Sequence, residues 1–166
     1  MTTVGTMNRL LVVHHAPTPS VEALLAAVLE GADDPEIEGV DVEARAALEP
    51  SADAVLDADG VLLVTPANFG YMSGALKHFF DTIFLQAGGA LGDDGAAATA
   101  SGGKKPYGLL VHGRYDTTGA VRSVQSIVQA LPWVQAAGIV EVLGDVDDAA
   151  LARARELGAT LAALVS

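Results

Sequence analysis

Short apolar runs alternate along this chain with segments in which apolar residues recur at helical spacing. The runs at residues 10–14, 61–64 and 107–111 are almost wholly apolar, which predicts parallel strands covered on both faces. Residues 40–44 and 139–143 predict two further strands. Because the strands alternate with helices, the pattern predicts an α/β fold with a doubly wound parallel sheet.

The predicted helices follow from the spacing of apolar residues and from their end signals. After the first strand, Thr18 suits a helix cap, Pro19 suits the first helical position and Gly31 suits the end. The inward stripes of the other helices are Leu76, Phe79, Phe80 and Ile83; Val121, Val124, Val128 and Leu131; and Leu151, Ala154, Gly158, Leu161 and Leu164.

A polar loop, residues 65–74, separates the third strand from its helix and reads Thr-Pro-Ala-Asn-Phe-Gly-Tyr-Met-Ser-Gly. We expect the strand to stop at Pro66, since proline cannot donate to a ladder. The loop brings Phe69 and Tyr71 to the carboxyl end of a buried strand, where open α/β sheets bind ligands. Two aromatic residues in this position favour a planar ligand that stacks.

The pattern T-P-x-x-F-G-x-M-S-G-x-L-K-x-F-x-D resembles the flavin-ring loop of the flavodoxin-like NAD(P)H:quinone oxidoreductases and NADPH-dependent FMN reductases. The resemblance covers most of the chain. It implies a flavodoxin-like three-layer sandwich whose five-stranded parallel sheet has the order 2-1-3-4-5, in a single FMN-binding domain over residues 1–166. A connection shaped only by Pro and Gly is the alternative. The residues that the resemblance places around the flavin ring are Pro66, Ala67, Asn68, Phe69, Gly70 and Tyr71.

The loop after the first strand leads into a helix N-terminus and can cradle a phosphate, because the first-turn amides point outward there. The family usually has hydroxyl residues around a glycine at this position. This chain departs from that pattern with Ala16, Pro17 and Pro19, and each proline removes a donor. Helix capping without a ligand is the alternative. The residues assigned to the cradle are His15, Thr18, Ser20 and Val21, with His14 as a further candidate.

The loop at residues 112–119 resembles, by its position, the second flavin loop of the family. Gly113 and Gly119 would let the backbone come close to a cofactor. Arg114 could offset negative charge and Tyr115 could stack on the ring. His112 begins the loop and is assigned to the same site. For Arg114, an exposed turn with a surface Arg–Asp pair is the alternative.

Composition excludes several classes of function. The chain of 166 residues has a formal net charge of −12, which argues against nucleic acid as a partner, and it has no cysteine for a disulfide or a thiol nucleophile. The four histidines show no metal-ligand spacing. No apolar run approaches the roughly 20 residues of a membrane span, and the first run is too short for a signal peptide. We therefore expect no membrane span and a cytoplasmic location.

Residues 86–105 form a Gly/Ala-rich insertion without periodicity. We expect it beside the ligand cleft, as a movable flap or as a contact with a second subunit. The run Gly102-Gly103-Lys104-Lys105 resembles part of a P-loop, but no Ser or Thr follows the lysines, and a strand comes next. A nucleotide triphosphate site is therefore unsupported.

These observations favour an FMN-binding oxidoreductase that transfers electrons from NAD(P)H to a quinone or another small-molecule acceptor. We assign no catalytic residue, because the flavin carries the chemistry. We expect a homo-oligomer. Two alternatives stay open: a flavodoxin-type carrier that passes electrons to a protein partner, and an interaction module that no longer binds flavin.

Overall fold

The computed structural model, which describes residues 5–87 and 104–166, is built around a parallel sheet. Five of its strands are β1 (Asn8–His14), β2 (Val40–Ala46), β3 (Gly60–Asn68), β5 (Pro106–Gly113) and β7 (Val140–Leu143). They lie in the order β2-β1-β3-β5-β7, with β5 pairing β7 from Leu110 to Gly113. The expected order 2-1-3-4-5 is thus confirmed. The short β6 (Val134–Gln135) pairs with the beginning of β5.

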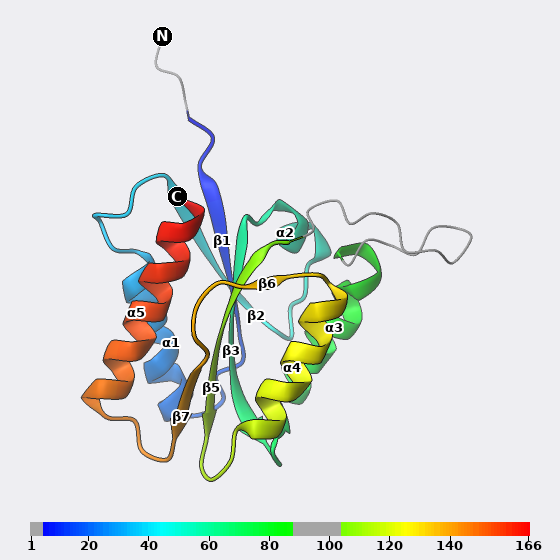
Figure 1. Ribbon diagram of the computed structural model, residues 1–166, viewed down its shortest axis with the longest axis vertical. Coiled ribbons are helices and arrows are strands. Elements are labelled where there is room, and N and C mark those ends of the chain that lie inside the picture. Colours follow the sequence, from blue (N-terminus) through cyan, green and yellow to red (C-terminus); the bar gives the residue numbers. More distant parts are fainter. Residues whose placement is uncertain (1–4, 88–103) are drawn as a thin grey trace.

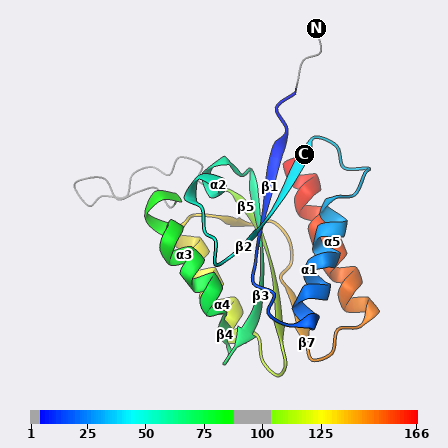
Figure 2. The same ribbon diagram turned by 180° about the vertical axis from the view of Figure 1, so that it is seen from behind.

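Helices cover both faces of the sheet, as Figures 1 and 2 show from opposite sides. One layer holds α1 (Pro19–Ala32) and α5 (Asp148–Val165). The other holds α2 (Ala52–Asp57), α3 (Gly74–Ala87) and α4 (Thr118–Ala130). Because side chains alternate along a strand, each central strand supplies both layers. In β1, for example, Leu10 and Val12 join the α1–α5 core, while Leu11 and Val13 join the other.

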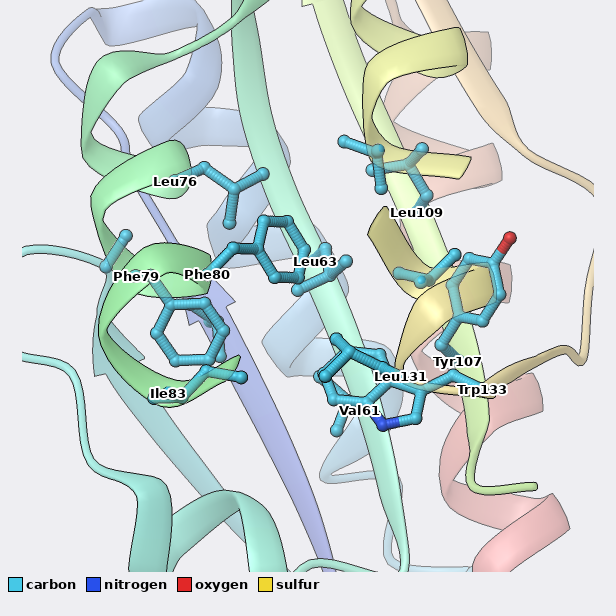
Figure 3. Packing of buried hydrophobic residues seen from close by; sticks show 14 of the residues in the cluster. Val61, Leu63, Leu76, Phe79, Phe80, Ile83, Tyr107, Leu109, Leu131 and Trp133 are labelled. Carbon is cyan, nitrogen blue, oxygen red and sulfur yellow. The ribbon is translucent and has the colours of Figure 1, made fainter. Parts of the chain in front are cut away.

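Aromatic residues fill the core beneath α3 and α4. Phe79 and Phe80 pack edge to face with ring centres 5.6 Å apart, and Phe80 lies 6.3 Å from Trp133. Figure 3 shows Phe80 beside Leu63 of the central strand β3, and Trp133 near Val61 of the same strand. The predicted α3 stripe is therefore confirmed, and it holds the helix firmly against the sheet.

Two glycines allow α1 and α5 to pack at close range, and one of them does not have the position that the sequence predicted. Gly31 does not end α1, which continues to Ala32. A Cβ atom at Gly31 would lie 1.9 Å from the Arg155 carbonyl oxygen, and one at Gly158 would lie 2.0 Å from that of Val28. These glycines are therefore needed for helix packing. In the predicted α5 stripe, Leu164 is exposed and does not face the core.

The strand β3 does not stop at Pro66, contrary to the sequence-based expectation. Pro66 pairs with His112 of β5, and the strand continues to Asn68. Its neighbour on the other side, β1, ends opposite Val64. Beyond Val64, the edge of β3 that faces β1 has no neighbouring strand to hydrogen-bond, so the amide that proline lacks costs no hydrogen bond.

The insertion expected at residues 86–105 lies mostly outside the described residues, which omit 88–103. Gln86 and Ala87 belong to α3. Lys105, the last residue of the P-loop-like run, is buried, and its Nζ donates hydrogen bonds to the carbonyls of Val55, at 2.7 Å, and Ala58. Burial lowers the pKa of Lys105. Lys105 therefore satisfies backbone carbonyls at the C-terminal end of α2.

Candidate functional site

Three loops meet at the edge of the sheet where the parallel strands end. His14, the last residue of β1, pairs with Val64 of β3, and Thr65 and Pro66 pair with the end of β5. The first loop (residues 15–18), the hairpin (residues 66–72) and the third loop (residues 114–117) therefore lie at one edge, at the bottom of Figure 1. This is the edge at which open α/β sheets bind ligands.

The first loop presents free backbone donors at the N-terminus of α1. Thr18 caps the helix, and its Oγ1 accepts a hydrogen bond of 3.3 Å from the Val21 amide. The Val21 amide is thus already paired. Within the described residues, the amides of Ala16, Thr18 and Ser20 have no protein acceptor. The amides of Thr18 and Ser20 lie at the positive end of the helix dipole and that of Ala16 lies in the loop before it, so donors for an anion remain despite the two prolines.

The two histidines of this region make contacts within the protein. The His15 amide donates to the Val64 carbonyl at 3.0 Å. Burial, and then the proximity of His15, lower the pKa of His14, so that His14 is neutral near pH 7 and adds no positive charge to the loop. A cavity of about 370 Å³ beside them is lined by His14, His15, Ala16, Pro17, Glu22, Leu25 and Ala46.

The expected flavin-ring loop is a tight β-hairpin. After Pro66, Ala67 pairs with Met72 and Asn68 with Tyr71 of the short antiparallel β4 (Tyr71–Met72). The two central residues have left-handed backbones, with φ of 52° at Phe69 and 74° at Gly70. This is the type I′ arrangement that suits a two-residue hairpin. The hairpin thus projects from the sheet edge and carries two aromatic residues.

Phe69 is strained and exposed at once. A left-handed backbone costs an L-residue roughly 1–2 kcal/mol, and Asn or Gly usually occupies such a position. Burial does not offset the cost, because Phe69 has a relative exposure of 109%. Strain of this kind is concentrated at ligand-binding sites, where the surrounding structure maintains it. Phe69 therefore makes the hairpin tip a candidate contact surface.

A buried pair of hydroxyls fixes the base of the hairpin. Thr65 Oγ1 lies 3.1 Å from Ser73 Oγ and accepts a hydrogen bond of 3.2 Å from the Ser73 amide. Ser73 Oγ in turn accepts from the Leu76 amide at 3.1 Å, which caps α3. The sequence did not lead us to predict this hydrogen-bonded pair. The available signal was a serine three residues before Leu76, which is a helix-cap pattern.

The third loop supports the hairpin from the other side. A Cβ atom on Gly119, in the first turn of α4, would lie 2.0 Å from the Gly70 carbonyl oxygen. One on Gly113 would lie 2.9 Å from Thr117 Cγ2 and 3.3 Å from Ala67 Cβ. Both glycines do allow a close approach, as expected, but what they approach in this structure is the protein itself, including the hairpin. They position the hairpin against α4.

Tyr115 and Arg114 stand free on the third loop. Tyr115 has a relative exposure of 88%, and Arg114 is also exposed. The alternative of an Arg114–Asp116 surface pair is not seen among the described residues. Instead, Asp116 accepts a hydrogen bond of 2.9 Å from the Thr118 amide, which lowers the pKa of Asp116. Tyr115, with Phe69 and Tyr71, gives this edge three exposed aromatic side chains on two loops.

The ring of His112 is tied to the neighbouring loop. Its Nε2 lies 2.7 Å from the Gly144 carbonyl oxygen, and the Gly144 amide donates to the Gly113 carbonyl at 2.8 Å. The His112 side chain therefore joins the end of β5 to the loop that follows β7. The Nε2 atom is thus engaged within the protein, and the assignment of His112 to a cofactor site stays a prediction.

Comparison with known proteins agrees with this geometry. A profile of the family described as NADPH-dependent FMN reductase matches residues 15–142, and so covers all three loops. The chain belongs to the NADPH-dependent FMN reductase family. The suspected family is thereby confirmed.

The related proteins include flavodoxins. The chain is 31% identical over 97 residues to a flavodoxin of Aquifex aeolicus (strain VF5), a match that covers 58% of this chain and 51% of that protein. The match thus spans about half the length of this relative.

Two solved structures illustrate the likeness in fold. An archaeal flavodoxin superposes with a TM-score of 0.74 at 15% identity, covering 95% of this chain and 98% of its own. A WrbA-like flavodoxin from Agrobacterium tumefaciens superposes with a TM-score of 0.70 at 17% identity, covering 95% and 97%. Within residues 5–87 and 104–166, no helix is both long and apolar enough to cross a membrane.

Proposed function

We propose that this family member binds FMN across the three loops and uses it to transfer electrons from NAD(P)H to a quinone or another small acceptor. The observation that carries the proposal is the strained, fully exposed Phe69 at the tip of the hairpin. Strain without burial is explained if the side chain contacts a ligand. FMN is the planar ligand that the family implies.

The described residues offer contacts to both ends of the FMN molecule, its phosphate and its flavin ring. The open amides of Ala16, Thr18 and Ser20 at the start of α1 match a single phosphate group. The exposed rings of Phe69 and Tyr115 offer apolar faces for the flavin ring. No dinucleotide fingerprint follows the first strand, so we expect FMN to bind more tightly than FAD.

When bound, FMN would supply the redox chemistry by taking up a hydride from NAD(P)H and passing electrons to the acceptor. The residues of this chain would bind the flavin and orient it. The first-loop amides hold the phosphate, and the hairpin, fixed by Thr65 and supported by Gly119, presents its backbone and rings to the flavin. Arg114 lies exposed beside Tyr115 and would offset negative charge there. Because NAD(P)H is a metabolite of the cell interior, the proposed donor implies a cytoplasmic site of action.

Flavin binding is tested by equilibrium dialysis with FMN, FAD and riboflavin. We expect FMN to bind most tightly. We expect the Thr18 and Ser20 hydroxyls to join the open amides in holding the phosphate. Replacing both residues by alanine should therefore weaken FMN binding by roughly 1–3 kcal/mol, or about 5- to 150-fold, and should hardly affect riboflavin, which has no phosphate. Because Thr18 also caps α1, the matched control is Ser51→Ala, which removes the cap of α2 away from this edge. Equal losses for FMN and riboflavin would show that the hydroxyls act only as helix caps.

Hydride transfer is tested under anaerobic conditions by adding NADH or NADPH to the FMN-loaded protein. We expect at least one of them to remove the absorbance of oxidised flavin, and a quinone to restore it. The second candidate function is electron transfer to a protein partner, which the flavodoxin relative and the net charge of −12 favour. Failure of both nicotinamides to reduce the bound flavin would support that candidate. Failure to bind any flavin would support the interaction module.

A further inference from the structure

An exposed carboxylate on the edge strand β7 reaches the third loop. Glu141 lies between Val140 and Val142, which are buried on the α5 side of the sheet, whereas the Glu141 side chain is exposed. Because side chains alternate along a strand, Glu141 points to the opposite face, which α4 covers. Its Oε1 accepts a hydrogen bond of 2.7 Å from Thr117 Oγ1. The bond therefore joins β7 to the residue directly before α4.

Thr117 does not use its hydroxyl as its position predicts. It is the cap residue of α4, and a threonine there normally accepts a hydrogen bond from an amide of the first turn. Within the part of the chain that the structure describes, the Thr117 hydroxyl makes no such bond. It donates to Glu141, while Asp116 Oδ1 accepts from the Thr118 amide at 2.9 Å. A local preference set aside in this way is typical of residues that serve a site.

The hydrogen bond is enclosed on the Thr117 side. Thr117 has a relative exposure of 3%, so loss of the acceptor would leave a buried hydroxyl without this partner. The Thr117 methyl group lies over Gly113, where an added Cβ atom would be 2.9 Å from Thr117 Cγ2. The Gly113 carbonyl in turn accepts from the Gly144 amide at 2.8 Å. A carboxylate acceptor strengthens such a bond, so Thr117 is firmly held.

The third loop is thus fixed at both ends by the β7 region and exposed in between. Gly113, at one end, is hydrogen-bonded to the loop that follows β7, and Thr117, at the other end, is bonded to Glu141. Arg114 and Tyr115 lie between these ends and are exposed, so packing of their side chains does not hold them in place. Where they lie therefore depends on the two ends of the loop.

We propose that Glu141 is a positioning residue of the flavin site: through Thr117 it holds the third loop where Arg114 and Tyr115 meet the flavin. This inference rests on the proposed function, since it concerns the same site. Glu141 itself does not touch the cofactor. A loop that is ordered before binding loses less conformational entropy when the ligand arrives, so the Glu141 contact raises affinity without adding to the interface. Because Tyr115 is assigned to the flavin ring, Glu141 should affect FMN and riboflavin alike.

Flavin binding to Glu141→Ala is the first test. We expect the dissociation constants of FMN and riboflavin to rise by the same factor, roughly tenfold, the effect of ordering one or two side chains at binding. Glu141→Gln keeps an oxygen acceptor for Thr117 and should recover most of the affinity. The matched control is Asp41→Ala, which removes an exposed carboxylate from β2, the opposite edge strand, and should change neither constant. Unchanged affinity in Glu141→Ala, a loss confined to FMN, or no recovery in Glu141→Gln would overturn the proposal.

A double-mutant cycle tests whether Glu141 acts through Thr117. Thr117→Val keeps the shape of the side chain and removes its hydroxyl. If the effect of Glu141 passes through that hydroxyl, the variant that combines Glu141→Ala with Thr117→Val should bind FMN no more weakly than Glu141→Ala alone. Two losses that multiply in the double variant would show that the residues act independently, and would refute this route.

Limited digestion of the flavin-free protein with trypsin tests the loop without a ligand. Trypsin cleaves after arginine, and Arg114 lies in the exposed part of the loop. We expect cleavage after Arg114, followed by mass spectrometry, to be at least about threefold faster in Glu141→Ala than in the wild type or Glu141→Gln. Cleavage after Arg155, within α5, should not change; an equal acceleration there would show general destabilisation and refute the positioning role.

The two measurements separate failure of this inference from failure of the proposed function. Unchanged cleavage after Arg114 in Glu141→Ala refutes the positioning role alone, even if the wild-type protein binds FMN. A wild-type protein that binds no flavin refutes the proposed function, and with it any role of Glu141 in flavin binding, whatever the digestion shows.

Discussion

Replacing Phe69 with asparagine should make the protein more stable while weakening its hold on FMN. Phe69 has a φ of 52° at the first central position of a type I′ turn, directly before Gly70. Asparagine tolerates this conformation, whereas phenylalanine bears roughly 1–2 kcal/mol of strain. The side chain is fully exposed, so no apolar burial is lost. We therefore expect Phe69→Asn to gain about 1 kcal/mol of unfolding free energy.

Thermal unfolding of the flavin-free protein measures this gain, and about 1 kcal/mol corresponds to a rise of roughly 2–4 °C in Tm for a chain of this size. The lost ring should raise the FMN dissociation constant about 2- to 12-fold, the effect of roughly 0.5–1.5 kcal/mol of aromatic contact. Phe69→Leu is the matched variant: it keeps the backbone strain and removes the ring, so Tm should change little while FMN still weakens. An unchanged or lower Tm for Phe69→Asn would refute the strain argument. Unchanged FMN affinity in both variants would remove Phe69 from the flavin site.

Three further predictions concern the parts that support the site. Gly119→Ala should displace the hairpin, because the added Cβ would lie 2.0 Å from the Gly70 carbonyl oxygen, and it should lower both Tm and FMN affinity. The control is Gly74→Ala, whose added Cβ has no other atom within 4 Å, so that Tm and FMN affinity should both be kept. Thr65→Val keeps the side-chain volume but leaves the buried Ser73 amide without its acceptor, the Thr65 hydroxyl. Chemical denaturation should therefore show a loss of about 1–3 kcal/mol in the free energy of unfolding. The pKa of His14 is lowered, so the unfolded chain takes up a proton first as the pH falls, and stability should decline below the ordinary histidine pKa of about 6.5. Denaturation at pH 7.5 and 5.5 checks this: His14→Asn should lose less stability between the two values than the wild type, and an equal loss would contradict it.

The sequence by itself determined the elements and their order. The buried strands are short, almost wholly apolar runs, and the helices repeat their apolar residues with a period of 3.6; both are local properties of the chain. The cap at Thr18, the stripe from Leu76 to Ile83 and the positions of the five main strands were therefore all readable in advance. The family loop motif also located the hairpin, since its Pro, Phe and Gly residues lie close together in the chain.

The tertiary structure alone decided how the site is held. Pro66 remains in the strand because β1 ends opposite Val64, before it reaches Pro66. Gly119 is needed because the Gly70 carbonyl lies against it, and the His112 ring contacts a carbonyl 32 residues away. Each of these depends on a partner distant in the chain, and hydrophobic period carries no information about such partners. The same limit applies to the strain at Phe69. Residue type favours left-handed backbone only at glycine and asparagine, so a phenylalanine in that conformation is revealed only when the register of β3 and β4 places the turn.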